Sequence, residues 1–218
     1  MPTVEAQLSP QERETVRTLF ANSLTNPVRV VLFVEATGCT YCAYTRQLLE
    51  EVADLSDQVS AEVYAFAANE ELAQQYQVDR VPAMVIIGER DRGVRIYGIP
   101  AGYEFPPFLE AIILVSRDDH GLAPSTTQML DALSEPVHLQ VFFSTNCPYC
   151  ADMVRLAHQF ALASDNVRAD AIDARQFADL YNRYNSEGVP ATVINGSMLV
   201  SGVMSESELV QNLLLALD

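Results

Sequence analysis

Cys147-Pro148-Tyr149-Cys150 is the stretch that decides the fold of this chain. It follows an apolar, β-branched run, which predicts a buried strand, and it precedes residues with the apolar periodicity of an amphipathic helix. A second pair of cysteines, in Cys39-Thr40-Tyr41-Cys42, lies 108 residues earlier, and the chain contains 4 cysteines in all. Every cysteine therefore belongs to one of two C-x-x-C motifs, and a functional interpretation has to explain both.

The two motifs belong to an internal repeat. At the same offset of 108 residues, Val81-Pro82-Ala83 falls on Val189-Pro190-Ala191. Different motifs that keep one offset without a gap indicate two homologous units. We expect unit 1 to cover residues 1–118 and unit 2 to cover residues 119–218. The polar stretch Arg117–Gly121 is too short for a free linker, so the units should pack against each other and could share one sheet.

The pattern of apolar residues, caps and turns predicts the same α/β order of elements in each unit: a mixed four-stranded sheet flanked by helices. In unit 1 the expected elements are a helix over 10–23, a strand over 28–35, the motif helix over 41–55, a strand over 62–67, a helix over 69–77, hairpin strands over 81–88 and 94–97, and a helix over 103–115. In unit 2 they are a helix over 125–134, a strand over 137–143, the motif helix over 149–163, a strand over 168–173, a helix over 176–184, hairpin strands over 191–194 and 198–200, and a helix over 206–217.

Composition and charge exclude several classes of function. The net charge is −16, and all 13 basic residues are arginines. Such a chain is repelled by nucleic-acid phosphates and by anionic lipid headgroups, so neither nucleic acid nor a membrane is an expected partner. No apolar run reaches the ~20 residues that span a bilayer, and the first residues lack the basic and apolar parts of a secretory signal. We therefore expect a cytoplasmic protein.

A C-x-x-C motif between a strand and a helix suits thiol–disulfide exchange. Unpaired N–H groups and the dipole at the start of the helix stabilise a thiolate there. We expect Cys39 and Cys147 to attack a partner disulfide, and Cys42 and Cys150 to be buried and to resolve the mixed disulfide. Between them, the neighbours Thr40, Tyr41, Pro148 and Tyr149 help to set the redox potential.

The Val-Pro element lies 40 residues after the second cysteine in both units. An X-Pro bond can be cis, and a backbone turn held beside the cysteines can pair with an extended substrate chain. A plain turn proline is the alternative for either one alone. Because Val81-Pro82 and Val189-Pro190 recur at one spacing behind C-x-x-C, we favour the substrate-binding interpretation.

The order of strand, C-x-x-C, helix, strand, helix, Val-Pro, hairpin and helix resembles a thioredoxin fold in each unit. The tetrad Cys147-Pro148-Tyr149-Cys150 is similar to the active-site tetrad of glutaredoxins. Two such units in one chain resemble the glutaredoxin-like protein disulfide oxidoreductases of thermophilic bacteria and archaea. The resemblance implies exchange of disulfides with protein substrates, cis-prolines at Pro82 and Pro190, electrons from a thioredoxin-reductase-type flavoprotein, and passage of electrons to partners such as a peroxiredoxin. It implies no cofactor beyond the cysteine pairs.

Two features depart from related families. Thioredoxins carry a buried aspartate six residues before the first cysteine, where this chain has Phe33 and Val141. Glu35 is a candidate substitute, although a solvated glutamate is the simpler interpretation. Glutathione-binding glutaredoxins have a Gly-Gly-x-Asp-like corner, whereas this chain has Ser201-Gly202-Val203-Met204, which argues against specific binding of glutathione.

Other functions compete with disulfide exchange. A zinc site needs both cysteine pairs in one coordination sphere, and their separation along the chain argues against it. A peptide-binding chaperone, or an electron-relay module that serves a peroxiredoxin, is the alternative function. Because Pro148 stiffens the start of its helix and Thr40 does not, we expect the second site to be the main one and the first to tune or relay. The residues His120, His138 and His158 match no motif, and we assign them surface or packing roles.

Overall fold

The computed structural model of the chain describes residues 8–217. Residues 1–7, which include most of the segment that argued against a secretory signal, lie outside the described part, as does residue 218. The helices are α1 (Pro10–Ser23), α2 (Cys42–Ala53), α3 (Glu70–Gln75), α4 (Phe105–Arg117), α5 (Pro124–Asp131), α6 (Cys150–Ala163), α7 (Ala178–Tyr181) and α8 (Glu206–Leu215), with short 3-10 turns η1 (Phe66–Ala68), η2 (Gly102–Glu104) and η3 (Asn182–Tyr184). The strands are β1 (Val28–Val34), β2 (Val59–Ala65), β3 (Ala83–Ile87), β4 (Asp91–Tyr97), β5 (Val137–Phe143), β6 (Val167–Asp173), β7 (Ala191–Ile194) and β8 (Met198–Ser201).

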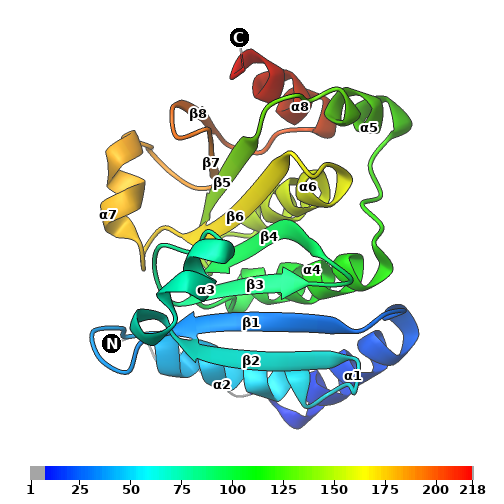
Figure 1. Cartoon of the computed structure of the whole chain (residues 1–218), viewed down its shortest axis with the longest axis vertical. Coiled ribbons are helices and arrows are strands. Elements are labelled where there is room, and N and C mark those ends of the chain that lie inside the picture. The colour runs from blue at the N-terminus through cyan, green and yellow to red at the C-terminus, as the bar shows by residue number, and fades with distance from the viewer. Residues whose placement is uncertain (1–7, 218) are drawn as a thin grey trace.

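All these strands form one 8-stranded sheet in the order β2-β1-β3-β4-β6-β5-β7-β8 (Figure 1). Each half of the sheet contains one parallel pair and one antiparallel hairpin, as the sequence predicted for each unit. The halves join through the parallel pair β4 and β6, with Val94 opposite Ala169 and Tyr97 opposite Ile172. The shared sheet, which the sequence left open, is therefore continuous across the two units.

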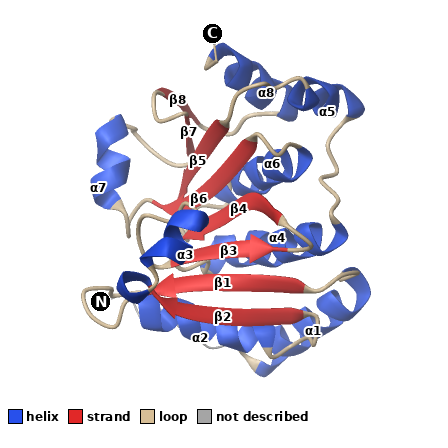
Figure 2. Ribbon diagram, in the orientation of Figure 1, coloured by secondary structure: helices blue, strands red, loops and turns tan. Residues whose placement is uncertain are grey.

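The helices are divided unequally between the two faces of the sheet (Figure 2). One core cluster contains residues of α1, α2, α4, α5, α6 and α8 and runs through both units, including Phe20, Leu49, Ile112 and Phe160. The other face is covered by α3 and α7, whose Ala73 and Leu180 belong to a second cluster. Successive strand residues alternate between the two clusters because side chains of a strand point to opposite faces.

Local sequence signals explain the helix ends. Ser9 and Glu12 form the capping box at the start of α1, with Pro10 as the first helical residue. The same device recurs at α8, where Ser205 caps the helix together with Glu208. A capping box satisfies backbone N–H groups that have no partner within the helix.

The strand β4 begins earlier than predicted. Residues 89–93 were expected to form the tip of the hairpin, but β4 starts at Asp91. The charged side chains there are paired: Arg95 binds Asp91, and Arg90 and Arg92 bind Asp165 in unit 2. The tip of this hairpin is thus held against the second unit, which a sequence pattern alone does not show. None of the described helices is both long enough and apolar enough to cross a membrane.

Candidate functional site

Both C-x-x-C motifs lie along the same edge of the sheet. The strands β1 and β5 point in the same direction, because β1 is antiparallel to β3, β3 is antiparallel to β4, and the pairs β4/β6 and β6/β5 are parallel. Each motif follows the carboxyl end of its strand and leads into α2 or α6. Four strand spacings separate β1 from β5, which is about 19 Å across the sheet.

At the second site, Cys147 and Cys150 form a disulfide with a Cα–Cα distance of 5.5 Å. The Cys147 N–H donates to the Ser144 carbonyl at 2.9 Å, which holds the turn after β5. The helix α6 begins at Cys150. The Sγ atom of Cys147 lies 3.7 Å from the carbonyl oxygen of Val189, so the first cysteine faces the Val-Pro turn.

The first site has the same arrangement. Cys39 and Cys42 form a disulfide with a Cα–Cα distance of 5.5 Å. The helix α2 begins at Cys42, whose Sγ accepts a hydrogen bond from the Glu35 N–H at 3.3 Å. Thr45 ties its hydroxyl back to the Tyr41 carbonyl at 2.9 Å, which fixes the start of the helix behind the motif.

The cysteines differ in exposure both within and between the sites. Cys42 and Cys150 are 3% and 0% exposed. Cys39 is half-buried, whereas Cys147 is only 9% exposed. The second cysteine of each pair is thus the more deeply buried one, which is what a resolving role requires.

The Val81–Pro82 and Val189–Pro190 peptide bonds are both cis. The Gly202 N–H donates to the Pro190 carbonyl at 2.8 Å, and the Gly98 N–H donates to the Pro82 carbonyl at 3.0 Å. A hollow of about 360 Å³ lies beside Pro190, between the preceding loop and the edge strand β8. The elements that the sequence singled out are therefore assembled separately in each unit.

The residues between the cysteines are arranged differently at the two sites. Pro148 and Tyr149 are both exposed, and Tyr149 is 68% accessible. At the first site Thr40 is exposed, but Tyr41 is half-buried and packs against the main core cluster. The second motif therefore presents more aromatic surface to solvent between its cysteines.

The sequence analysis missed Glu104, an acid beside the second motif. Glu104 is 2% exposed, and its Oε1 atom has no hydrogen-bond partner among the described residues. It belongs to η2, which lies against α6 and is tied to the residues before Cys147 by the Tyr103 N–H, which donates to the Thr145 carbonyl at 3.0 Å. Burial, and secondarily the nearby carboxyl of Asp173, raise the pKa of Glu104 to about 8. Nothing in the local sequence marks this glutamate, because its burial depends on the packing of unit 1 against unit 2.

The residues considered as replacements for the thioredoxin aspartate have other surroundings. Phe33 and Val141 are fully buried in the two apolar clusters. The carboxyl of Glu35 accepts a hydrogen bond from the Ala67 N–H at 2.6 Å, so it ties the end of β1 to η1.

Two of the three histidines contribute to packing and pairing. His158 is 1% exposed, its Nε2 lies 3.3 Å from the Arg95 carbonyl oxygen, and burial lowers its pKa to about 4. His138 contacts the buried carboxyl of Asp170 at 2.6 Å. Both imidazoles thus bind groups of the central strands β4 and β6, which agrees with the packing roles expected of them.

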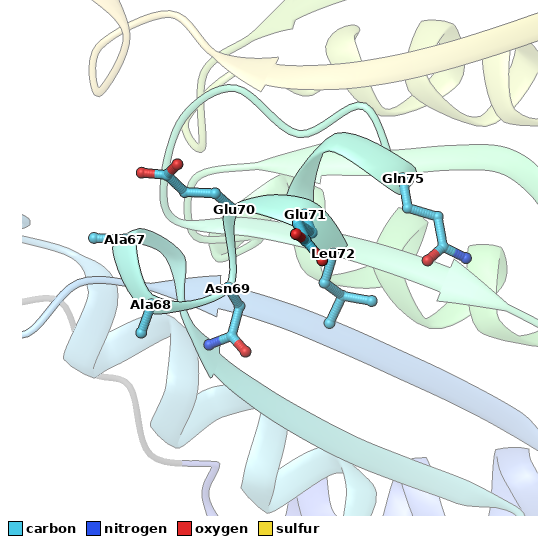
Figure 3. A pocket seen from close by; sticks show the side chains of 7 residues that line it. All are labelled: Ala67, Ala68, Asn69, Glu70, Glu71, Leu72 and Gln75. Carbon is cyan, nitrogen blue, oxygen red and sulfur yellow. The ribbon is translucent and has the colours of Figure 1, made fainter.

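Another hollow, of about 570 Å³, lies along η1 and α3. Figure 3 shows that its lining side chains, which include Glu70, Leu72 and Gln75, point in different directions rather than toward one point. No cysteine lines it among the described residues. Its chemistry therefore does not match the redox motifs, and the disulfide sites remain the candidate functional sites.

Comparison with known proteins agrees with this geometry. A family model described as thioredoxin domain matches residues 28–106 and residues 137–214. A protein disulfide oxidoreductase from Aeropyrum pernix has a similar structure, with a TM-score of 0.88, 30% sequence identity, and coverage of 95% of this chain and 92% of that one. The NTD_N/C domain of alkylhydroperoxide reductase AhpF from Enterococcus faecalis has the same fold, with a TM-score of 0.87, 23% identity, and coverage of 95% of this chain and 100% of that one.

A curated relative is longer than this chain. The alkyl hydroperoxide reductase AhpF of Escherichia coli is 25% identical over 192 residues, which is 88% of this chain but 34% of that protein. The chain thus spans about a third of the length of the curated relatives that it matches most significantly.

Proposed function

The chain belongs to the thioredoxin domain family, with two such units in tandem, and on that premise we propose that it exchanges disulfides with protein substrates as a glutaredoxin-like protein disulfide oxidoreductase. One observation carries the proposal: each unit holds a C-x-x-C disulfide at the start of a helix, and Cys147 faces a cis Val-Pro turn. The similarity to a protein disulfide oxidoreductase over nearly the whole chain supports it.

The proposed reaction begins with the reduced form of a site. The thiolate of Cys147 attacks one sulfur of a client disulfide, and the other client sulfur leaves and takes up a proton. Cys150 then loses its proton and attacks the Cys147 sulfur, which releases the second client thiol and closes the disulfide seen in the structure. Two electrons and two protons pass to the client. A second dithiol, supplied by a reductase, restores the site.

The roles of the individual residues are part of the proposal. Cys39 and Cys147 are the attacking thiols, because each precedes the start of a helix, and Cys42 and Cys150 resolve because they are buried. The turns at Val81-Pro82 and Val189-Pro190 pair with the client backbone. The carbonyl of Val189 lies close enough to Cys147 to accept a hydrogen bond from its thiol in the reduced state.

Partners and cellular location are also proposed. We place the chain in the cytoplasm, where dithiols are kept reduced, and expect a thioredoxin-reductase-type flavoprotein as the electron source. Delivery of electrons to a peroxiredoxin is a second candidate function. It is favoured by the relatives named as alkyl hydroperoxide reductases of the AhpF type, one of which this chain matches over 88% of its length.

Reduction of a protein disulfide tests the proposal. We expect Cys147→Ser with Cys150→Ser to remove most of the rate at which the chain reduces an insulin-type disulfide with dithiothreitol as reductant. We expect Cys39→Ser with Cys42→Ser to remove a smaller part. If the chain without any cysteine still protects a client from aggregation as well as wild type does, and wild type reduces nothing, the chaperone alternative replaces this proposal.

A further inference from the structure

Exposed apolar side chains gather near the second motif. Among the described residues, the large apolar side chains that are exposed are Tyr44, Tyr103, Met129, Tyr149, Val203, Leu214 and Leu215. Three of them, Tyr103, Tyr149 and Val203, stand on backbone at or beside the Cys147 site. Exposed apolar groups that gather around a reactive atom mark a surface for a partner.

Two of these three residues come from unit 2 itself. Tyr149 lies within the tetrad and is 68% exposed. Val203 is 50% exposed and directly follows Gly202, whose N–H donates to the carbonyl of the cis residue Pro190 at 2.8 Å. These two residues therefore flank the reactive disulfide within its own unit.

The third residue, Tyr103, comes from unit 1. Its N–H donates to the carbonyl of Thr145, two residues before Cys147, at 3.0 Å. The preceding Gly102 packs so closely that a Cβ atom there would collide with the same carbonyl oxygen. The backbone of Tyr103 is thus fixed against the second motif, while its side chain is 54% exposed.

The sheet order places the first site differently. Beside β5, the sheet continues through β6 to β4 of unit 1, and the segment that follows β4 reaches the second motif. Beside β1 lies β2, which is the outermost of the described strands. The sheet therefore gives the second site a flank from the other unit, whereas the corresponding side of the first site ends at an edge strand.

The space beside Pro190 indicates what kind of partner fits. It measures about 360 Å³, which accommodates a few side chains of an extended peptide. Its lining includes Glu187 and, among the described residues that line it, no basic side chain. Together with the net charge of −16, this lining disfavours acidic peptides.

We propose that Tyr103 of unit 1 joins Tyr149 and Val203 in a client-contact rim at the second site. The rim selects extended, non-acidic polypeptides that carry an aromatic or aliphatic side chain next to the reactive cysteine. This inference rests on the proposed disulfide exchange and names its substrate class. The tandem packing thereby makes one of two similar sites selective.

The test uses the full chain with Cys39→Ser and Cys42→Ser, so that only the second site reacts. Two peptides each carry one cysteine as a mixed disulfide with a chromophoric thiol; in one peptide phenylalanine flanks the cysteine, and in the other serine does. The pre-reduced protein is mixed with each peptide, and release of the chromophore gives the half-saturating concentration and the limiting rate. The same measurements follow for Tyr103→Ser, Tyr103→Leu and the matched control Tyr44→Ser, which alters an exposed tyrosine on α2.

We expect Tyr103→Ser to raise the half-saturating concentration for the phenylalanine peptide about two- to tenfold, with little change in the limiting rate. The serine peptide should be unaffected, Tyr103→Leu should retain the preference, and Tyr44→Ser should behave like the parent. Equal effects of Tyr103→Ser and Tyr44→Ser, or no effect of either, overturn the rim while leaving the disulfide exchange intact. A parent protein that reduces neither peptide overturns the proposed function and the rim together.

Discussion

At the scale of single residues, the buried pair of carboxyls near the second motif has the most chemical consequence. Glu104 has a pKa of about 8, raised first by burial and then by Asp173, whose own pKa is raised by burial. A carboxyl that gains and loses its proton near neutral pH suits proton exchange with a thiol. Because η2 lies against α6, we assign Glu104 the role of exchanging a proton with the dithiol of the second site.

The substitution Glu104→Gln tests this role through pH dependence. The folded pKa lies above the usual 4.5, so the protonated form stabilises the fold, and stability is lost as the pH rises from about 4.5 through 8. We expect Glu104→Gln to abolish this loss and to be the more stable protein at pH 9, by at most several kcal/mol at about 1.4 kcal/mol per unit. Urea unfolding between pH 5 and 9 measures the difference.

The same variant should slow turnover at the second site and remove its inflection near pH 8, while the first site keeps its rate. The companion substitution Asp173→Asn removes the neighbouring charge and should shift that inflection to lower pH. An unchanged pH profile in both variants would contradict the assignment.

At the scale of elements, η2 links one unit to the motif of the other. Gly102 has φ of 60°, and a Cβ atom there would meet the Thr145 carbonyl. Gly196, in the β7–β8 turn, has φ of 70° but nothing within 4 Å of its Cβ position. The two glycines thus share a backbone conformation and differ in the space around them.

This pair gives a matched prediction. Gly196→Ala should cost about 1–2 kcal/mol for a left-handed residue with a Cβ atom, and it should leave both redox sites unchanged. Gly102→Ala should cost more, because η2 must also move away from Thr145, and it should lower the rate at the second site. Urea unfolding and single-site turnover check both; equal costs would show that the close contact has no energetic weight.

At the scale of the whole molecule, the two units form one body through several kinds of contact. The ladder between β4 and β6 makes the sheet continuous. The helices α4 and α6 pack together, with Arg155 bound to Glu110 at 2.5 Å, and Arg92 binds Asp165. Splitting the units would expose both the apolar core and two strand edges.

Cleavage of the connection tests this organisation and the proposed boundary after residue 118. With a protease site inserted between His120 and Gly121, we expect the two halves to remain associated after cutting, because the seam does not depend on the connecting loop. Size-exclusion chromatography should show one species with the mass of the whole chain. Unit 2 produced alone should be less stable and prone to aggregate, and halves that separate freely on cutting would contradict a shared core.

Sequence reasoning recovered most of the elements and the reactive groups of both sites. The strand over 137–143 and the hairpin strand over 191–194 match β5 and β7 residue for residue, because buried strands are written in local, continuous apolar runs. Shifts at other ends, such as the start of β2 at Val59 instead of residue 62, come from pairing with a neighbouring strand. A pairing of that kind extends a strand beyond its apolar run.

The sequence by itself determined two thioredoxin-like units and a C-x-x-C pair with a Val-Pro turn in each, because spacing within a unit is local and is repeated along the chain. Only the tertiary structure decided how the units meet. It placed both motifs on one edge of a single sheet and brought Tyr103 and Glu104 of unit 1 beside the second motif. These residues are far from Cys147 in sequence, and they acquire their surroundings only when β4 pairs with β6 and water is excluded from the seam.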